Sequence, residues 1–113
     1  MNISRGDVIR VQLDPTRGSE IRKTRPCVVV QRDAANRGGR TTIVCPLTDA
    51  DGKQPSRLAI AVAAGIGGTS KDSLVLCSRI WTVDKVRLTE KLGALPADII
   101  EGVDAGLRAV LDL

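Results

Sequence analysis

Short apolar segments separated by polar turns make up most of this chain, and they limit its fold more than any other feature. Residues 7–13 (DVIRVQL) alternate apolar and polar side chains, the period of a strand with one buried face. Residues 26–31 (PCVVVQ) form an apolar, β-branched run, typical of a strand buried on both faces. Further strands are expected at residues 41–47, 57–62, 73–79, 80–83 and 90–95. Because no crossover helix separates these segments, they predict a mainly β fold, an antiparallel sheet curled into a small barrel.

Turn residues mark the boundaries between these strands. Asp14-Pro15 ends the first strand, and residues 36–40 (NRGGR) and 65–68 (GIGG) predict flexible turns. Pro46 has no backbone N–H to donate, so we expect it at a strand end or on an edge strand.

The end of the chain changes its period. From Ala97 onward the apolar residues follow the 3.6-residue spacing of a helix and fall on one side of it. This predicts one amphipathic C-terminal helix lying against the barrel, with Pro96 well placed at its start. Gly102 and Gly106 are expected to weaken its middle. With 113 residues the chain has room for one domain, which we expect to span residues 1–113.

Two absences exclude whole classes of enzyme. The chain contains no histidine, and Trp81 is its only aromatic residue. A Ser-His-Asp triad, a Cys-His pair and a histidine-based ribonuclease are therefore impossible. A single tryptophan also cannot form the row of aromatic side chains that holds single-stranded nucleic acid. Cys27, Cys45 and Cys77 are too few for a four-thiolate zinc site and lie in apolar runs. We expect buried thiols, no metal and no cofactor.

Positive charge is concentrated in the first part of the chain. Lysine and arginine number 17 against 13 aspartate and glutamate, a net charge of +4. Residues 1–40 hold nine basic and four acidic side chains (net +5), whereas residues 41–113 hold eight and nine (net −1). This distribution favours a polyanionic partner. No apolar run approaches the roughly 18 residues of a membrane span, and no signal core opens the chain, so we expect a cytoplasmic protein without membrane contact.

Residues 17–25 (RGSEIRKTR) are the densest group of chemically useful side chains. The segment holds three arginines and one lysine together with a carboxylate and two hydroxyls. Loops on a rigid sheet commonly carry binding groups, and guanidinium groups suit the anionic oxygens of a phosphodiester. The segment therefore indicates a site for nucleic acid.

Three blocks of this sequence resemble the MazF/PemK (Kid) toxins of bacterial toxin–antitoxin pairs. They are RGDVIRVQLDPTRGSEIRKTRPCVVVQRDAANR, TTIVCPLT and SKDSLVLCSRIWTVDKVRL, and the resemblance covers essentially the whole chain. It implies an SH3-like barrel of the CcdB/PemK type with an appended helix, and a homodimer. It also implies a sequence-specific, metal-independent endoribonuclease that cuts single-stranded RNA, and a cognate antitoxin, for which we expect a flexible acidic tail.

The resemblance also implies roles for individual residues. Arg25 in KTRP and Thr48 at the end of CPLT match the catalytic positions. Ser19 and Glu20 match loop positions that face RNA. The further residues expected to contact RNA are Arg17, Lys23 and Arg79. Asp84 and Lys85 of TVDK are as well suited to hold a turn or the dimer as to touch RNA.

The chemistry is possible without histidine. The 2′-hydroxyl of the substrate attacks the adjacent phosphate, giving a 2′,3′-cyclic phosphate and a free 5′-hydroxyl. Arg25 can stabilise the developing negative charge, and Thr48 can donate a hydrogen bond to a non-bridging oxygen. Either Arg25 itself moves protons, or it acts through its charge alone and Glu20 or solvent accepts the 2′-hydroxyl proton, because a guanidinium is not normally deprotonated.

Two other functions are compatible with the sequence. A CcdB-like toxin that binds gyrase shares the expected barrel, and a fold alone does not determine function. A non-catalytic RNA-binding barrel would use the same basic residues, bind RNA with strong salt dependence and leave it intact.

Overall fold

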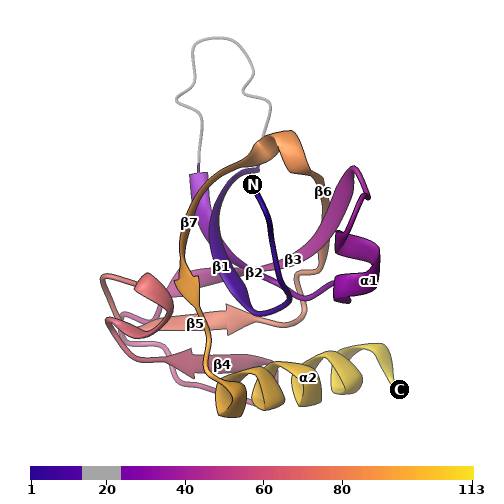
Figure 1. Cartoon of the computed structure of the whole chain (residues 1–113). Coiled ribbons are helices and arrows are strands. Elements are labelled where there is room, and N and C mark those ends of the chain that lie inside the picture. Colours follow the sequence, from indigo (N-terminus) through magenta and orange to yellow (C-terminus); the bar gives the residue numbers. More distant parts are fainter. Residues whose placement is uncertain (14–23) are drawn as a thin grey trace, which may run out of the picture.

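The computed structural model describes residues 1–13 and 24–113, which form a strongly curled antiparallel sheet and a C-terminal helix (Figure 1). The strands run in the order β4-β5-β3-β2-β1-β7, and β6 pairs with β3. Every pairing is antiparallel, which confirms the expected mainly β fold. The strand bounds are β1 Asp7–Gln12, β2 Thr24–Val29, β3 Thr41–Asp49, β4 Ala59–Val62, β5 Ser73–Leu76, β6 Trp81–Asp84 and β7 Leu88–Ala94.

Strand β3 connects the two parts of the sheet. It pairs with β2 along one edge; along the other it pairs first with β6 through Thr41–Val44 and then with β5 through Leu47–Asp49. Pro46 lies inside this strand, so its expected place at a strand end or an edge was wrong. It is tolerated because it follows the last residue paired with β6 and precedes the first paired with β5, at a break in the ladder.

Alternate residues of the central strands pack into two apolar cores. Val28 joins a first core that also contains Cys45, Leu47 and Val103. The neighbouring residues Cys27 and Val29 join a second core with Ile9, Val11, Val44, Val83 and Leu88. Because successive side chains of a strand point to opposite faces, β2 is buried on both, as its continuous apolar sequence predicts.

Helix α2, Ala97–Leu111, lies beneath β4 and β5 in Figure 1 and covers the first core. Val103 is buried whereas Glu101 and Arg108 are exposed, so the expected amphipathic helix is confirmed. Gly106 has a role that the sequence pattern did not predict. A Cβ there would lie 2.6 Å from Cys77 Sγ and 2.9 Å from the Arg57 carbonyl oxygen. The glycine lets the helix approach the sheet closely. Among the described residues, no helix is both long and apolar enough to cross a membrane.

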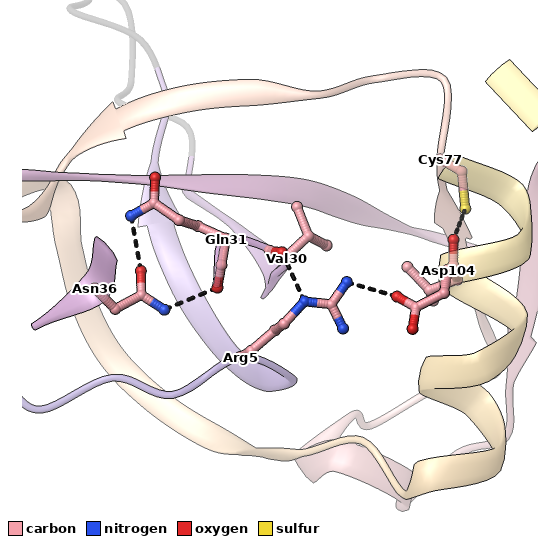
Figure 2. Close-up of polar contacts among 7 residues, drawn as sticks. Arg5, Val30, Gln31, Asn36, Cys77 and Asp104 are labelled. Carbon is pink, nitrogen blue, oxygen red and sulfur yellow. Dashed lines mark hydrogen bonds and ion pairs between the residues drawn. The ribbon is translucent and has the colours of Figure 1, made fainter. Parts of the chain in front are cut away.

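A second helix, α1, Asp33–Asn36, comes directly before the expected flexible turn of residues 36–40 and shares only Asn36 with it. Asn36 is buried: its side-chain oxygen accepts hydrogen bonds from Gln31 (2.9 Å) and Thr42 (2.8 Å), and its amide donates to the Gln31 carbonyl at 2.9 Å (Figure 2). Lys85 Nζ donates to the Asn36 carbonyl, and Asp84 accepts from the Val86 N–H. The TVDK segment therefore holds a turn, one of the three roles left open for it.

Arg5 joins the start of the chain to helix α2. Its Nε donates to the Val30 carbonyl at 2.8 Å, and its Nη2 contacts Asp104 at 2.5 Å (Figure 2). On the same side of α2, the buried Cys77 thiol approaches the Val103 carbonyl at 3.8 Å. These contacts fix the helix against the sheet, away from the β2 and β3 ends that carry the predicted catalytic residues.

Candidate active site

Arg25 and Thr48 come together through the pairing of β2 with β3. The last described pair of these strands is Cys27 with Pro46, and the same register two residues further on places Arg25 level with Thr48. Each is an even number of residues from Cys27 or Val44, whose side chains share the second core, so Arg25 and Thr48 lie on one face. Both are half-buried, and both line the same hollow.

This first hollow has a volume of about 450 Å³ and lies between the ends of β2 and β3 and the loop before β5. Besides Arg25 and Thr48 it is lined by cationic and hydroxyl side chains that motif reasoning did not single out, among them Arg10, Ser70 and Lys71. They come from β1 and from the loop, and only the tertiary pairing of distant strands brings them to one place. The hollow therefore offers cations and hydroxyl donors, the groups that bind phosphate oxygens.

The cations of the first hollow are held by weak surface pairs. Arg10 Nε lies 3.5 Å from Glu90 and Lys71 Nζ lies 3.5 Å from Asp49. Exposed pairs of this kind contribute about 0–1 kcal/mol, so a phosphate can replace the carboxylate at little cost. The hydrogen bond from the Asp51 N–H, together with the charge of Lys71, holds the pKa of Asp49 below its ordinary value. Asp49 is therefore an ionised acceptor beside Thr48.

A second hollow, of about 520 Å³, lies on the other side of Arg25. Arg25, Arg79 and Trp81 line it together with Leu13, Ile80, Thr82 and Val83. Arg79 is exposed and belongs to the connection between β5 and β6, because β5 ends at Leu76 and not at residue 79 as expected. The structure thus brings Arg79 close to Arg25, but in this second hollow and not in the one lined by Thr48.

The four other residues predicted to contact RNA, Arg17, Ser19, Glu20 and Lys23, lie outside the described residues. Among the residues that the structure describes, no three histidine, cysteine, aspartate or glutamate side chains are grouped closely enough to hold a metal ion.

None of the three cysteines has the character of a nucleophile, although Cys27 lies two residues from Arg25. All three are free and buried, as expected. Burial raises the pKa of the Cys27 thiol to about 12, a rise that the positive charge of Arg25 opposes only in part. Burial likewise raises the pKa of Cys45 to about 12. Because the thiolate is the nucleophilic form, these thiols are inert at neutral pH.

Comparison with known proteins agrees with this geometry. The family model described as "PemK-like, MazF-like toxin of type II toxin-antitoxin system" matches residues 4–111. The chain is 36% identical over 113 residues to endoribonuclease EndoA of Bacillus subtilis, which covers 100% of this chain and 97% of that relative. It is 37% identical to endoribonuclease MazF of Staphylococcus epidermidis, which covers 98% of this chain and 92% of the relative.

Solved structures show the same fold. The MazE–MazF structure (Form-II) from Deinococcus radiodurans aligns with a TM-score of 0.84 at 24% identity, covering 100% of this chain and 98% of that chain. A mycobacterial endoribonuclease solved in complex with its cognate antitoxin aligns with a TM-score of 0.74 at 21% identity, covering 99% and 95%. On the match of the family model and of both curated relatives along nearly its whole length, this chain belongs to the PemK-like, MazF-like toxins of type II toxin–antitoxin systems.

Proposed function

We propose that this protein, an endoribonuclease toxin of the MazF-like family, cleaves single-stranded RNA at specific sequences without a metal ion. The observation that carries the proposal is that Arg25 and Thr48, from different strands, line one hollow whose other walls include Arg10, Ser70 and Lys71. A phosphodiester placed there meets cations and hydroxyl donors on several sides. The two endoribonuclease relatives, each more than 35% identical over nearly the whole chain, support the reaction class.

The reaction uses a nucleophile that the substrate carries. The 2′-hydroxyl attacks the adjacent phosphorus and the bond to the 5′-oxygen breaks, leaving a 2′,3′-cyclic phosphate on one fragment and a 5′-hydroxyl on the other. The phosphorane carries more negative charge than the ground state, so a fixed Arg25 guanidinium stabilises it preferentially. The Thr48 hydroxyl donates a hydrogen bond to a non-bridging oxygen.

Two protons must also move, and the described residues contain no histidine to carry them. Arg25, Glu20 and water are the candidate acceptors for the proton of the 2′-hydroxyl. The pH–rate profile of Glu20→Gln tests whether Glu20 is the acceptor. An unchanged acid limb eliminates Glu20, whereas loss of that limb identifies Glu20 as the group that accepts the 2′-hydroxyl proton. Without a good general base the reaction is slower by about 10²–10⁴-fold.

Substrate binding and regulation use the positive charge around the site. Arg79 contacts the RNA together with Arg17, Ser19, Glu20 and Lys23, and the protein acts as a homodimer. Its inhibitor is a cognate antitoxin whose flexible acidic tail occupies the same basic groove and competes with RNA. The relative solved with its cognate antitoxin and the MazE–MazF structure support such a partner.

The decisive experiment is cleavage of a long single-stranded RNA in EDTA, with the 5′ ends of the fragments mapped by sequencing. We expect cuts at a small set of sequences, fragments that end in 2′,3′-cyclic phosphate, and no cut where the 2′-hydroxyl before the scissile bond is replaced by hydrogen. Cleavage of that deoxy substrate would require a hydrolytic mechanism instead. Full activity of the Arg25→Ala/Thr48→Ala double variant would remove both residues from the reaction.

A further inference from the structure

Trp81, the only aromatic residue of the chain, lies between the second core and the second hollow. It opens β6, pairs with Val44 of β3, and packs against the second core as a half-buried side chain. Part of the indole nevertheless lines the second hollow, together with Arg25 and Arg79.

The second hollow offers a flat ring an aromatic surface that the first hollow does not have. Its volume of about 520 Å³ falls within the range of small-molecule sites, roughly 300–1,000 Å³. Its walls combine apolar side chains, Leu13, Ile80 and Val83, with the indole and two guanidinium groups. Nucleobases stack on aromatic faces and on guanidinium planes, and arginine donates to base-edge acceptors. The first hollow is also lined in part by apolar side chains, Pro26, Leu47 and Leu92, but it has no aromatic side chain on which a base could stack.

We propose that the second hollow binds one unstacked nucleobase of the RNA, stacked on Trp81, with the edge of the base toward Arg79. Arg25 borders both hollows, so the base belongs to a nucleotide next to the scissile phosphate. This inference rests on the proposed ribonuclease function and adds to it the residue that holds a base. One tryptophan cannot form a row of stacking residues, but it is sufficient for a single base.

The wild-type protein reports on this site directly, since all aromatic emission comes from Trp81. The probe is an oligoribonucleotide spanning a mapped cleavage sequence, with a single 2′-deoxynucleotide at the cut so that it binds without being cleaved. We expect this probe to quench tryptophan emission. A series of probes, each lacking the base at one position, should contain one member that binds but no longer quenches.

Variants test the same contact by binding. Trp81→Leu should weaken probe binding, measured by anisotropy of a terminal fluorophore, by about 5- to 150-fold, the usual loss for one stacked base. Trp81→Phe should retain most of the affinity, and Val86→Ala, at an exposed residue that lines neither hollow, serves as the control. The decisive comparison is a cycle: against the probe that lacks the critical base, Trp81→Leu should cost nothing further.

Three results would overturn the assignment. One is equal quenching by every base-deleted probe, and another is a Trp81→Leu loss that is the same for all probes. The third is a tryptophan emission that shifts with protein concentration in the absence of RNA and does not change further when RNA is added. That result would place Trp81 against a second copy of the chain. The wild-type readout does not depend on folding of the variants. A protein that cuts RNA without position-specific quenching loses only this base site, whereas one that does not cut RNA loses the proposed function.

Discussion

At the scale of single residues, the arrangement assigns different tasks to Arg25 and Thr48. Arg25 offers a fixed positive charge bordering both hollows, and Thr48 offers one hydroxyl donor to the first. A substitution can remove the hydroxyl donor while keeping the shape of the side chain, or keep the positive charge while changing its geometry. Matched substitutions can therefore separate the contributions of Thr48 and Arg25.

Thr48→Val keeps the shape of the side chain and removes its hydroxyl, so we expect the single-turnover cleavage rate to fall by about 10²–10³-fold. Thr48→Ser should restore most of that rate, because it restores the donor. Arg25→Lys keeps a positive charge but loses the planar fork, and it should recover only part of the loss caused by Arg25→Ala. Equal rates for Thr48→Val and wild type would show that the hydroxyl is not used.

The buried thiols of Cys27 and Cys45 should make the stability of the protein depend on pH. Their pKa of about 12 in the folded protein lies above the ordinary value of 9.0, so the unfolded chain releases these protons first as pH rises. The folded state then binds more protons than the unfolded state, and the free energy of unfolding must decline with pH. The contribution is complete below about pH 9 and is lost between about pH 9 and 12.

Denaturant unfolding between pH 7 and 10.5 measures this decline. We expect a shallower slope above pH 9 in the Cys27→Ala/Cys45→Ala variant than in wild type, whatever the stability of the variant at pH 7. The slope is the informative quantity, because the cavities left by the substitutions lower stability at every pH. Identical slopes would mean that the thiols do not contribute.

Only some residues of the candidate site could be identified from the sequence. Arg25 and Thr48 could be predicted because each lies in a short recognisable block. Arg10 and Lys71 could not, since neither residue has a motif of its own and the first hollow exists only once β1, β2, β3 and the loop before β5 are assembled. Trp81 was counted as evidence against a stacking surface, because the sequence does not show that it borders a hollow.

At the scale of elements, hydrophobic period predicted most of the structure. The strands and α2 lie where alternation and the 3.6-residue period place them, with boundaries shifted by a few residues. Helix α1 was not predicted, because its four residues are too short to show a period. The expected position of Pro46 was wrong because a proline can lie inside β3 only where the strand changes its partner from β6 to β5, and the sequence does not show this change. From the sequence, Gly106 was expected only to weaken the helix. That a side chain there would collide with Cys77 depends on how α2 packs against the sheet.

The two glycines of α2 give a matched test of that distinction. Alanine at either position improves helix propensity by about 1 kcal/mol. At Gly106, however, the new Cβ would lie 2.6 Å from Cys77 Sγ and 2.9 Å from a backbone oxygen, whereas at Gly102 it meets only the Ile60 side chain, at 3.2 Å. Overpacking costs about 1–3 kcal/mol, so we expect Gly106→Ala to be clearly less stable than Gly102→Ala in denaturant unfolding. Equal stabilities would show that α2 can move away from the sheet without loss.

At the scale of the whole molecule, charge and architecture point to the same face. The cations of the first hollow come from β1, β2 and the loop before β5, and Arg79 extends them across the second hollow. Helix α2 contributes no residue to either hollow, although it carries the exposed Arg108. A long RNA is therefore expected to bind on the side of the two hollows. Arg79 lies on that side, whereas Arg108 lies on helix α2, away from both hollows.

Salt dependence of RNA binding distinguishes these two positions. Each phosphate contact releases counterions, and for single strands it adds about 0.7 to the slope of log affinity against log salt. Arg79→Gln and Arg108→Gln lower the net charge equally, from +4 to +3. If Arg79 contacts a phosphate in addition to the base edge, Arg79→Gln lowers the slope by about 0.7. If it contacts the base alone, affinity falls while the slope stays unchanged. Arg108→Gln should leave both unchanged, and an equal effect of the two substitutions would show that RNA responds to net charge and not to this face of the barrel.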